Sequence, residues 1–502
     1  MINATLEDFS YTQDVSPASL LEQYQEEMGM SEAGAIRYDK MNARMQRVGT
    51  EQDTSYGTRI TSGYINPLAV HIEKWVADAK IKAGRYHSAA AYLDLFDDKR
   101  VVAMLTIQSV LAQLSQPYTK LTATALDIGS KLEDELRLAE LRADDRWVYK
   151  GIVKACKDKG EYKRKSNTAK YIMEKKEGRE WVKWPVNNRL HLGIALIDML
   201  IAESGMVVVY NKKERGKTIA MIRATEETRV WITANQDAMR YMSPVLEPMS
   251  VPPKPYVHGE LEGGYLTNHI PQTPLVKTSN RKYLEELKNA DMPVLLNAVN
   301  AAQATGWHIN REVLALQREL FQTDSELGDI PRVTPYEIPT KPDDIATNDE
   351  SRIRYRTAAK LAHEANVNLV SRRMTYQMVL ATADKMKPKT AFYMPANLDF
   401  RGRLYFLPML NPQGADYIKG LLEFAEKKRI GVEGIYWLKV HTANLFGVDK
   451  VSFADRIQWV DDNMEMLIAN AKNPTTFRDW ASADKPFQAM AACLELVKVQ
   501  DF

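Results

Sequence analysis

The stretch FYMPANLDFRGRLYFLPMLNPQGADYIKG, Phe392–Gly420, carries the pattern on which the interpretation of this sequence depends. Apolar and polar residues alternate along it, as is typical of a β-strand, and this alternation predicts Asp399, Arg401 and Arg403 on one face of an extended segment. Gly402 predicts a bulge or a close backbone approach. The Asn-Pro-Gln-Gly sequence that follows predicts a turn.

Two roles fit these charged residues. Asp399 can hold a neighbouring guanidinium in place and leave N–H donors free for phosphate oxygens. Tyr405 then offers a ring or a hydroxyl to a sugar or base, and Lys419 adds a positive charge beyond the turn. In the other role an Asp–Arg pair simply locks a hairpin. The residues alone leave both roles open.

Composition indicates a globular protein. The 502 residues, 45% of them apolar, are enough for about three domains. No run of 18 apolar residues occurs, so we expect no membrane span. Two cysteines favour neither a disulfide framework nor a zinc cluster and fit a reducing compartment. The first 36 residues contain seven acidic residues and no Lys or Arg, so we expect no targeting segment.

The formal net charge of +2 conceals two strongly basic runs. Residues 150–183 contain 12 basic and 5 acidic residues, and residues 351–390 contain 9 basic and 2 acidic residues. Each run therefore has a net charge of +7. Such runs are either solvated helix faces or the binding surface of an extended polyanion.

The N-terminal part is predicted to be mostly helical. Ser16-Pro17 is typical of a helix start, and the spacing of apolar residues predicts helices over 66–83, 101–114, 121–142 and 186–203. A short basic and aromatic loop containing Arg85 lies at 82–87. Two apolar runs, 206–210 and 218–222, predict a β-hairpin whose tip, NKKERGK, contains Lys212, Lys213, Arg215 and Lys217. An ordinary exposed hairpin is the alternative role, in which the lysines protect the strand edge.

The middle of the chain is predicted to contain an irregular segment and a projecting arm. Residues 243–272 are rich in Pro and Gly, which excludes regular helices. Helices are predicted over 293–305, 308–321 and 351–386, with a loop over 323–350. Two long helical segments joined by that loop predict an arm with Arg372 and Arg373 on its basic helix. The arm either clamps a duplex or packs in a bundle.

From residue 391 the predicted character is α/β, with strands near 391–393 and 403–407. Ser452 and Asp455 have the spacing of a capping box that opens a helix. Asp461 and Asp462 are adjacent within that helix, where neighbours point about 100° apart, so we expect a solvated face and no metal site.

The Asp399-Phe400-Arg401-Gly402-Arg403 sequence, the Asn-Pro-Gln-Gly turn and Lys419-Gly-Leu-Leu resemble the D-x-x-G-R region of single-subunit DNA-directed RNA polymerases of the bacteriophage and mitochondrial type. The resemblance extends to GVEGIYWLKVHTANLFGVDKV (431–451), QATGWHIN (303–310), SVPPKPY (250–256) and EGGY (262–265). It is similar to the bacteriophage branch along the whole sequence.

The resemblance implies a truncated right-hand polymerase architecture. It implies a mainly α N-terminal promoter-binding domain (1–303), a helical thumb (304–389) and the first, incomplete part of an α/β palm (390–502). Residues 150–183 match a segment that in this family changes position when the enzyme leaves the promoter.

The resemblance also implies roles for particular residues. Arg85 lies in a loop similar to the one that reaches an AT-rich minor groove. The hairpin with Lys212, Lys213, Arg215 and Lys217 is similar to the one that opens the duplex, although its tip has no apolar wedge. Arg403, Tyr405 and Lys419 match positions that contact template strand or hybrid. The further residues that we predict to bind nucleic acid are Asp399, Arg401, Arg372 and Arg373.

Catalysis in this family implies two Mg²⁺ ions held by two palm aspartates. The motifs that supply them are expected beyond residue 502, so we expect no catalytic or metal-binding residue in this chain and no activity of the chain alone.

We therefore expect the N-terminal portion of a phage-type DNA-directed RNA polymerase, a nucleotidyltransferase. The implied partners are promoter DNA, template strand, RNA transcript, nucleoside triphosphates and a second chain that carries the rest of palm and fingers, with no membrane. The implied place is the cytoplasm of an infected bacterium. The alternative is a non-catalytic DNA-binding protein derived from such a polymerase.

Overall fold

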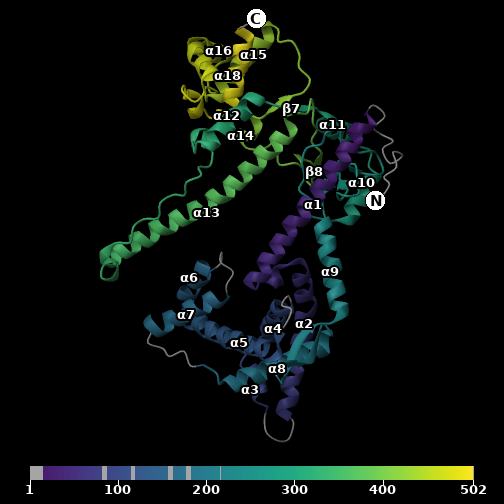
Figure 1. Ribbon diagram of the computed structural model, residues 1–502, viewed down its shortest axis with the longest axis vertical. Helices are drawn as coiled ribbons and strands as arrows, with labels where there is room; N and C mark the ends of the chain where they lie inside the picture. Colours follow the sequence, from purple (N-terminus) through teal and green to yellow (C-terminus); the bar gives the residue numbers. More distant parts are fainter. Residues whose placement is uncertain are drawn as a thin grey trace. The chain divides into compact units, whose positions relative to one another are not determined.

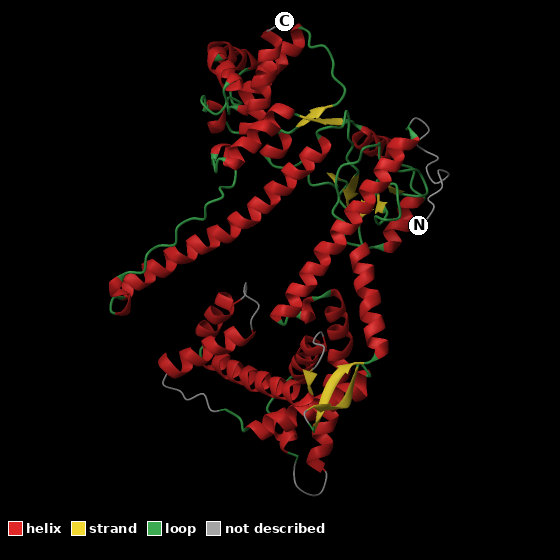
Figure 2. Ribbon diagram, viewed as in Figure 1, coloured by secondary structure: helices red, strands yellow, loops and turns green. Residues whose placement is uncertain are grey.

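The computed structural model describes residues 15–81, 87–114, 119–156, 162–176, 183–214 and 216–500. The chain forms two compact units. Residues 32–244 make up one, called here the 32–244 unit; residues up to 31 and residues 245–502 make up the other, called the 245–502 unit. Both are mostly helical with a few short strands, as the sequence predicted (Figures 1 and 2).

The 32–244 unit is a helical assembly with one small sheet. Its helices are the second part of α1 (Pro17–Val48), η2 (Glu51–Asp53), α2 (Ser55–Ile81), α3 (Ser88–Asp94), α4 (Lys99–Leu114), α5 (Leu121–Asp144), α6 (Arg146–Cys156), α7 (Tyr162–Lys176), α8 (Val186–Ser204) and α9 (Glu226–Tyr241). Its strands are β1 (Thr119–Lys120), β2 (Val207–Glu214) and β3 (Lys217–Ala224).

Helices α5 and α8 cross at very short range in the centre of this unit. A Cβ atom on Gly193 would lie 2.0 Å from the carbonyl oxygen of Ala125, and one on Gly129 would lie 2.5 Å from that of Arg189. Only glycine permits such an approach of two backbones. The fully buried side chains of Leu132 and Leu196 belong to the core that this crossing organises.

The predicted β-hairpin is present. Strands β2 and β3 pair antiparallel from Val207 opposite Ala224 to Glu214 opposite Lys217, and β1 adds a third strand beside β3. The strands are longer than the sequence predicted, so Lys212, Lys213 and Lys217 belong to the ladder and not to the tip. The reversal itself uses Gly216, whose φ is 77°.

The 245–502 unit contains the quoted stretch. Its helices are the first part of α1, α10 (Arg281–Lys288), α11 (Pro293–Ala304), α12 (Arg311–Gln322), η4 (Leu327–Asp329), η5 (Asp343–Ala346), α13 (Asp349–Met386), α14 (Asp416–Lys419), α15 (Val432–Leu445), α16 (Phe453–Asp462), α17 (Met464–Lys472), η6 (Asp479–Ser482) and α18 (Pro486–Gln500). Its strands are β4 (Glu262–Gly263), β5 (Thr273–Pro274), β6 (Val276–Lys277), β7 (Trp307–Ile309), β8 (Ala396–Asp399), β9 (Leu404–Phe406) and β10 (Leu422–Phe424).

A three-stranded sheet joins distant parts of this unit. Strand β8 pairs parallel with β6 on one side and antiparallel with β9 on the other. The irregular 245–275 segment is thereby fixed to the quoted stretch, with Leu398 N–H donating to Leu275 and Tyr256 Oη donating to Ala396. The predicted lack of regular helix in 243–272 is confirmed.

A buried carboxylate fixes the start of α1 in the same unit. Glu27 accepts hydrogen bonds from Leu266 N (2.9 Å), Thr267 N (2.8 Å) and Thr267 Oγ1 (2.6 Å). Burial raises the pKa of Glu27 even though these donors oppose the shift. The predicted helix start is confirmed, since Ser16 Oγ accepts from Ser19 N.

The arm differs from its prediction. The long helix is present as α13, whose 38 residues give a length of about 57 Å. Its companion, however, is not a second long helix, because α12 has only 12 residues. Residues 330–342 run back along α13 as an extended chain, which we call the return segment, because four prolines exclude a helix there (Figure 2).

Two other boundaries were predicted wrongly. The helix expected from residue 308 begins at Arg311, because Trp307–Ile309 pair with β10 and Asn310 caps α12 by accepting from Val313 N. The strand expected at 391–393 forms only isolated bridges, and the regular strand is β8. The three predicted domain boundaries, 1–303, 304–389 and 390–502, stay a prediction. Among the described residues, no helix combines the length and apolarity needed to cross a membrane.

The buried Glu51 generates a stability prediction. Its side chain is fully buried, both carboxylate oxygens lack a hydrogen-bond partner within the described part of the chain, and desolvation raises its pKa against the opposing charge of Lys131. When folding raises the pKa of a carboxyl group, the group contributes its full stabilisation at pH values below its pKa in the unfolded chain. That contribution is lost as the pH rises through its pKa in the folded chain. We expect Glu51→Gln to increase the free energy of unfolding by about 1 kcal/mol at pH 7 and not at pH 4.

Urea unfolding followed by circular dichroism at both pH values measures this difference. Asp53→Asn, on the exposed side of the same short helix, is the matched control. An equal effect of Glu51→Gln at the two pH values would contradict the assignment.

Candidate nucleic-acid interface

The Asp399–Arg403 stretch is a tight turn between β8 and β9. Asp399 N–H donates to Arg403 O (2.9 Å), and Gly402 N–H donates to Asp399 O (2.9 Å). Gly402 has φ 79°, a left-handed conformation that glycine adopts without strain. The predicted placement of Asp399, Arg401 and Arg403 on one face of an extended strand is therefore wrong, because the chain reverses between them.

The Asp399 carboxylate organises the turn. Its Oδ1 accepts from the backbone N–H groups of Arg401 (2.8 Å) and Arg403 (3.0 Å), as in an Asx turn. Its Oδ2 accepts from Arg401 Nε (2.9 Å) and Nη2 (2.7 Å). Desolvation opposes ionisation, but the Arg403 N–H and the Arg401 guanidinium outweigh it and lower the pKa of Asp399.

The two arginines of the turn differ in how many hydrogen-bond donors remain free. Arg401 is bound by Asp399 through two nitrogens, and its guanidinium lies 5.4 Å from the ring centroid of Phe400. The Arg403 side chain is exposed, and nothing in the described part of the chain pairs with its guanidinium. Asp399 and Arg401 thus lock the hairpin, whereas Arg403 presents five unused donors to solvent.

The Asn-Pro-Gln-Gly turn supports the same hairpin from its outer edge. Gln413 Nε2 donates to Leu404 O (2.7 Å), and Gln413 Oε1 accepts from Phe406 N (3.1 Å). A side-chain amide therefore satisfies the backbone of edge strand β9. Tyr405 is 42% exposed on this strand, and half-buried Lys419 ends the short helix α14 that follows the turn.

Arg372 and Arg373 lie on α13, apart from the Asp399 turn in sequence and fold. The Arg372 guanidinium contacts both the carboxylate and the backbone carbonyl oxygen of Asp329, each at 2.9 Å. Arg373 Nη1 donates to Val333 O (3.1 Å). Both guanidinium groups therefore hold the start of the return segment to the long helix.

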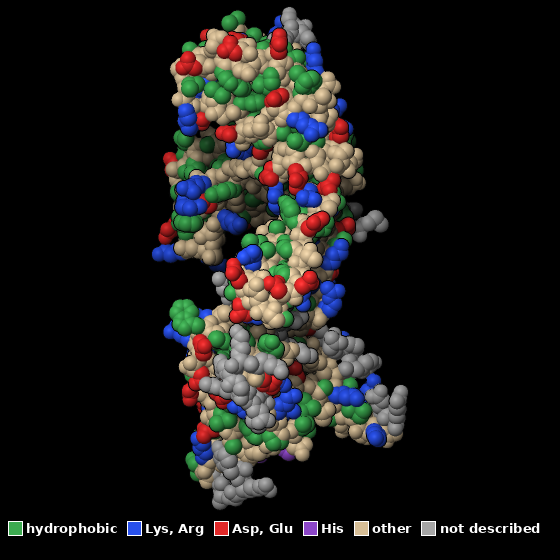
Figure 3. Space-filling model, turned by 90° about the vertical axis from the view of Figure 1, so that its left-hand side faces the viewer, with side chains coloured by type: hydrophobic (Ala, Val, Ile, Leu, Met, Phe, Trp, Pro, Cys, Tyr) green, Lys and Arg blue, Asp and Glu red, His purple; other side chains and the backbone are tan. Residues whose placement is uncertain are grey.

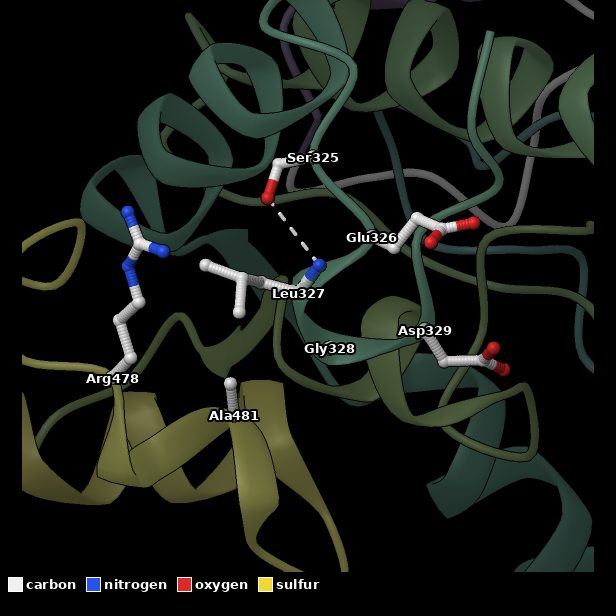
Figure 4. A pocket seen from close by; sticks show the side chains of 7 residues that line it. All are labelled: Ser325, Glu326, Leu327, Gly328, Asp329, Arg478 and Ala481. Carbon is white, nitrogen blue, oxygen red and sulfur yellow. Dashed lines mark hydrogen bonds between the residues drawn. The ribbon is translucent and has the colours of Figure 1, made fainter. Parts of the chain in front are cut away.

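A shallow recess next to this junction is lined by Ser325, Glu326, Leu327, Gly328, Asp329, Arg478 and Ala481 (Figure 4). Its two carboxylates already have partners, since Glu326 pairs with Arg332 and Asp329 with Arg372. Figure 4 shows Arg478 and Asp329 on opposite sides of the recess. We assign it a supporting role at the base of the arm.

The predicted promoter-contacting residues lie in the 32–244 unit. Arg85 and Arg215 lie outside the described residues. Lys213 and Lys217 are exposed and Lys212 is half-buried. Because side chains alternate along a strand and Lys213 lies opposite Thr218, Lys213 points to one face of the hairpin while Lys212 and Lys217 point to the other.

Sequence reasoning missed the bracing residues. The role of Gln413 shows only in the register of β9, which the sequence does not specify. Asp416 accepts from Phe487 N (2.7 Å) and Gln488 Nε2 (3.0 Å), so it anchors the start of α18 to α14. An Asp directly after a turn, such as Asp416, is typical of a residue that caps a helix. The backbone N–H that Asp416 accepts from, however, belongs to Phe487, 71 residues further along the chain.

The acidic residues of the described chain offer no metal site. No group of three or more His, Cys, Asp or Glu side chains there is placed to hold an ion. In α16, Asp461 pairs with Lys439, and Asp462 accepts from Gln458 Nε2 (2.8 Å). The described residues therefore do not fit the Mg²⁺ ions that the resemblance implies, and we assign no step to a metal here.

Comparison with known proteins identifies the family. A family described as "DNA-directed RNA polymerase N-terminal" matches residues 22–303, and one described as "DNA-dependent RNA polymerase" matches residues 428–502. The chain belongs to the single-subunit, phage-type RNA polymerases.

Among its relatives in this polymerase family, the DNA-directed RNA polymerase of Enterobacteria phage T3 is 34% identical over 479 residues, which covers 93% of this chain and 54% of the relative. The RNA polymerase of Escherichia phage T7 is 34% identical with the same coverage. A mitochondrial DNA-directed RNA polymerase of Nicotiana tabacum is 34% identical over 53% of this chain. The chain spans about half the length of the phage relatives and corresponds to their N-terminal portion.

The turn makes a prediction that separates its two roles. Asp399→Ala removes an acceptor for two backbone N–H groups and for Arg401, so we expect faster tryptic cleavage at 401–403 in the free chain. Arg403→Ala should leave the turn intact and lower the affinity for an RNA–DNA hybrid, reducing the salt slope by about 1. Limited proteolysis and fluorescence anisotropy at several salt concentrations measure the two effects. Unchanged hybrid affinity of Arg403→Ala would contradict its assignment.

The arm makes another prediction. We expect Arg373→Ala to release the return segment, with a local stability loss of about 1–3 kcal/mol because a charge-assisted hydrogen bond to Val333 is removed. Hydrogen exchange of the backbone amides of Val333, Thr334 and Tyr336 reports the change. Arg354→Ala, which removes only an exposed pair with Glu350, is the control and should leave those amides protected. Equal exchange in both variants would show that Arg373 does not hold the segment.

Proposed function

We propose that this chain performs the nucleic-acid-binding steps of transcription as the N-terminal portion of a phage-type DNA-directed RNA polymerase. Membership of the family carries the proposal. The exposed Lys213 and Lys217 of the hairpin support promoter binding, and the exposed Arg403 on a braced turn supports binding of template strand or hybrid. Each contributes phosphate neutralisation, which positions a nucleic acid without reading its sequence.

In this proposal the residues of the Asp399 turn orient the bound nucleic acid and take no part in a chemical step. Asp399 fixes the backbone and Arg401, so that Arg403 is held on a rigid strand end, which reduces the entropy lost when it binds a phosphate. The Tyr405 ring on the same hairpin offers a surface for a sugar or base, and Lys419 adds a further positive charge. Arg372 and Arg373 act indirectly, by keeping the arm straight beside its return segment.

We further propose that nucleotidyl transfer requires palm and fingers segments that carry the catalytic aspartates, supplied by a second chain or by further sequence. Mg²⁺ and nucleoside triphosphates are then bound by those segments, and Mg²⁺ supplies the stabilisation of the attacking and leaving oxygens. The place of action is the cytoplasm of an infected bacterium. This chain contributes promoter DNA, template and transcript contacts.

Promoter binding tests the proposal directly. We expect the chain to bind upstream promoter duplex with an affinity that falls steeply with salt, and Lys213→Ala with Lys217→Ala to reduce the salt slope by about 2. Anisotropy of a labelled duplex between low and moderate salt measures both. Lys282→Ala, at an exposed lysine of α10, is the matched control.

Mixing the chain with a separately made palm–fingers fragment tests the catalytic part. RNA synthesis from promoter DNA by the mixture, and by neither component alone, is the expected result. Duplex binding without RNA synthesis under any mixing condition would favour the alternative of a non-catalytic DNA-binding protein. An absence of duplex binding would contradict the proposal itself.

A further inference from the structure

A buried glutamine joins three helices of the 245–502 unit. Gln317 of α12 is fully buried. Its Nε2 donates to the carbonyl oxygen of Tyr417 in α14 (2.8 Å), and its Oε1 accepts from the hydroxyl of Tyr376 in α13 (3.1 Å). Burying an amide is costly unless both of its ends are hydrogen-bonded, and here both are. We call Gln317, Tyr376 and Tyr417 together the Gln317 bridge.

Aromatic rings pack around the Gln317 bridge. The centroid of the Tyr376 ring lies 5.0 Å from that of Tyr417 and 5.3 Å from that of Phe321 in α12. Burial raises the pKa of Tyr376 and that of Tyr417, so both hydroxyls stay protonated. A buried polar network whose members are all satisfied specifies one arrangement of the elements that it joins. The bridge therefore fixes the base of the arm against α14.

Helix α14 depends on such contacts for its position. It has only four residues, too few to be stable by itself. Asp416 anchors it to α18, the Tyr417 carbonyl oxygen belongs to the Gln317 bridge, and Ile418 is buried. Lys419 is different, because nothing in the described part of the chain pairs with its ammonium group. The short helix thus carries an unpaired cation on a fixed backbone.

The surface charges of this unit are dispersed. In the upper part of Figure 3, which belongs to the 245–502 unit, Lys and Arg side chains are interspersed with acidic and hydrophobic ones. On such a surface no broad field of one sign attracts a polyanion, so individual cations on a fixed backbone matter more. Arg403 and Lys419 are cations of this kind.

We propose that Gln317 is a positioning residue for nucleic-acid binding, which makes the placement of Lys419 depend on the arm. Through Tyr417 it fixes the backbone of α14, and through Tyr376 it ties that backbone to α13. A shift of α13 at Tyr376 is therefore transmitted to Tyr417, two residues before Lys419. By thermodynamic linkage, a nucleic acid bound by Lys419 stabilises the position of the arm in turn. The inference rests on the proposed function, in which Lys419 contacts the template strand or hybrid.

Hybrid binding by the full chain tests this role. Fluorescence anisotropy of a labelled RNA–DNA hybrid at several salt concentrations gives the affinity and the salt slope. We expect Lys419→Ala to weaken binding by about fivefold and to reduce the salt slope by about 1, because one phosphate contact is lost. Gln317→Leu should have the same two effects, although it removes no charge. In the Lys419→Ala background, Gln317→Leu should cause no further loss of affinity.

Urea unfolding of the same variants separates positioning from stability. Gln317→Leu leaves the Tyr376 hydroxyl without its partner, so it should lower the unfolding midpoint. Adding Tyr376→Phe removes that hydroxyl and keeps the ring, so the double variant should recover part of the stability and none of the affinity. If Gln317→Leu alone does not fold, the double variant gives the same comparison of hybrid binding.

Tyr265→Phe is the matched control for loss of a buried hydrogen bond. The Tyr265 hydroxyl donates to the Glu247 carbonyl oxygen (2.8 Å) elsewhere in the same unit. This variant should lower the unfolding midpoint and leave both the hybrid affinity and the salt slope unchanged.

Three results would overturn the inference alone. Wild-type hybrid affinity and salt slope in the Gln317 variants would make the bridge purely structural. Additive losses from Gln317→Leu and Lys419→Ala would show that the bridge acts on another contact. Wild-type affinity of Lys419→Ala would remove Lys419 from the interface. In each case the wild-type chain still binds the hybrid, whereas a wild-type chain that binds neither hybrid nor promoter duplex would contradict the proposed function as well.

Discussion

The Asp399 carboxylate is the interaction on which the candidate interface depends. It satisfies two backbone N–H groups and one guanidinium at a position where the chain must reverse within a few residues. The reversal lets β9 pair with β8, its neighbour in sequence, and β8 in turn pairs with β6, which lies much earlier in the chain. Gly402 supplies the left-handed backbone, and Gln413 completes the outer edge. These contacts fix the backbone from which the exposed Arg403 side chain extends.

The sequence predicted local structure correctly where the apolar residues follow a single helical or strand period. Apolar spacing located α13 to within two residues at its start, and the two short apolar runs located the hairpin. It failed in two situations: where a side chain accepts from the nearby backbone and reverses the chain, and where a partner distant in sequence decides the structure. Alternation through residues 399–403 is compatible with a strand, but the hydrogen bonds that the Asp399 carboxylate accepts from nearby backbone N–H groups favour a turn. His308 and Ile309 were predicted to begin a helix, yet they pair with β10 as part of the strand β7.

The sequence predicted which residue types make up the candidate site, but it predicted only part of what each residue does. Basic residues in 351–390 are visible in the sequence, but Arg372 and Arg373 bind carbonyl groups about 40 residues away, which no local pattern contains. Asp399 and Arg401 fit the structural role that the sequence left open, and Arg403 retains free donors. The polymerase family membership, by contrast, follows from long co-linear motifs, and the comparisons confirm it.

The central claim is that the rigid end of the β8–β9 hairpin faces nucleic acid. Photo-crosslinking measures this most directly: an RNA–DNA hybrid with 4-thiouridine in its RNA strand is bound to the chain, irradiated, and its adducts are located by peptide mass spectrometry. The account predicts adducts within residues 400–405, reduced when salt releases the hybrid. Adducts confined to other segments, with none at 400–405, would contradict it and leave the Asp399 turn with a purely structural role.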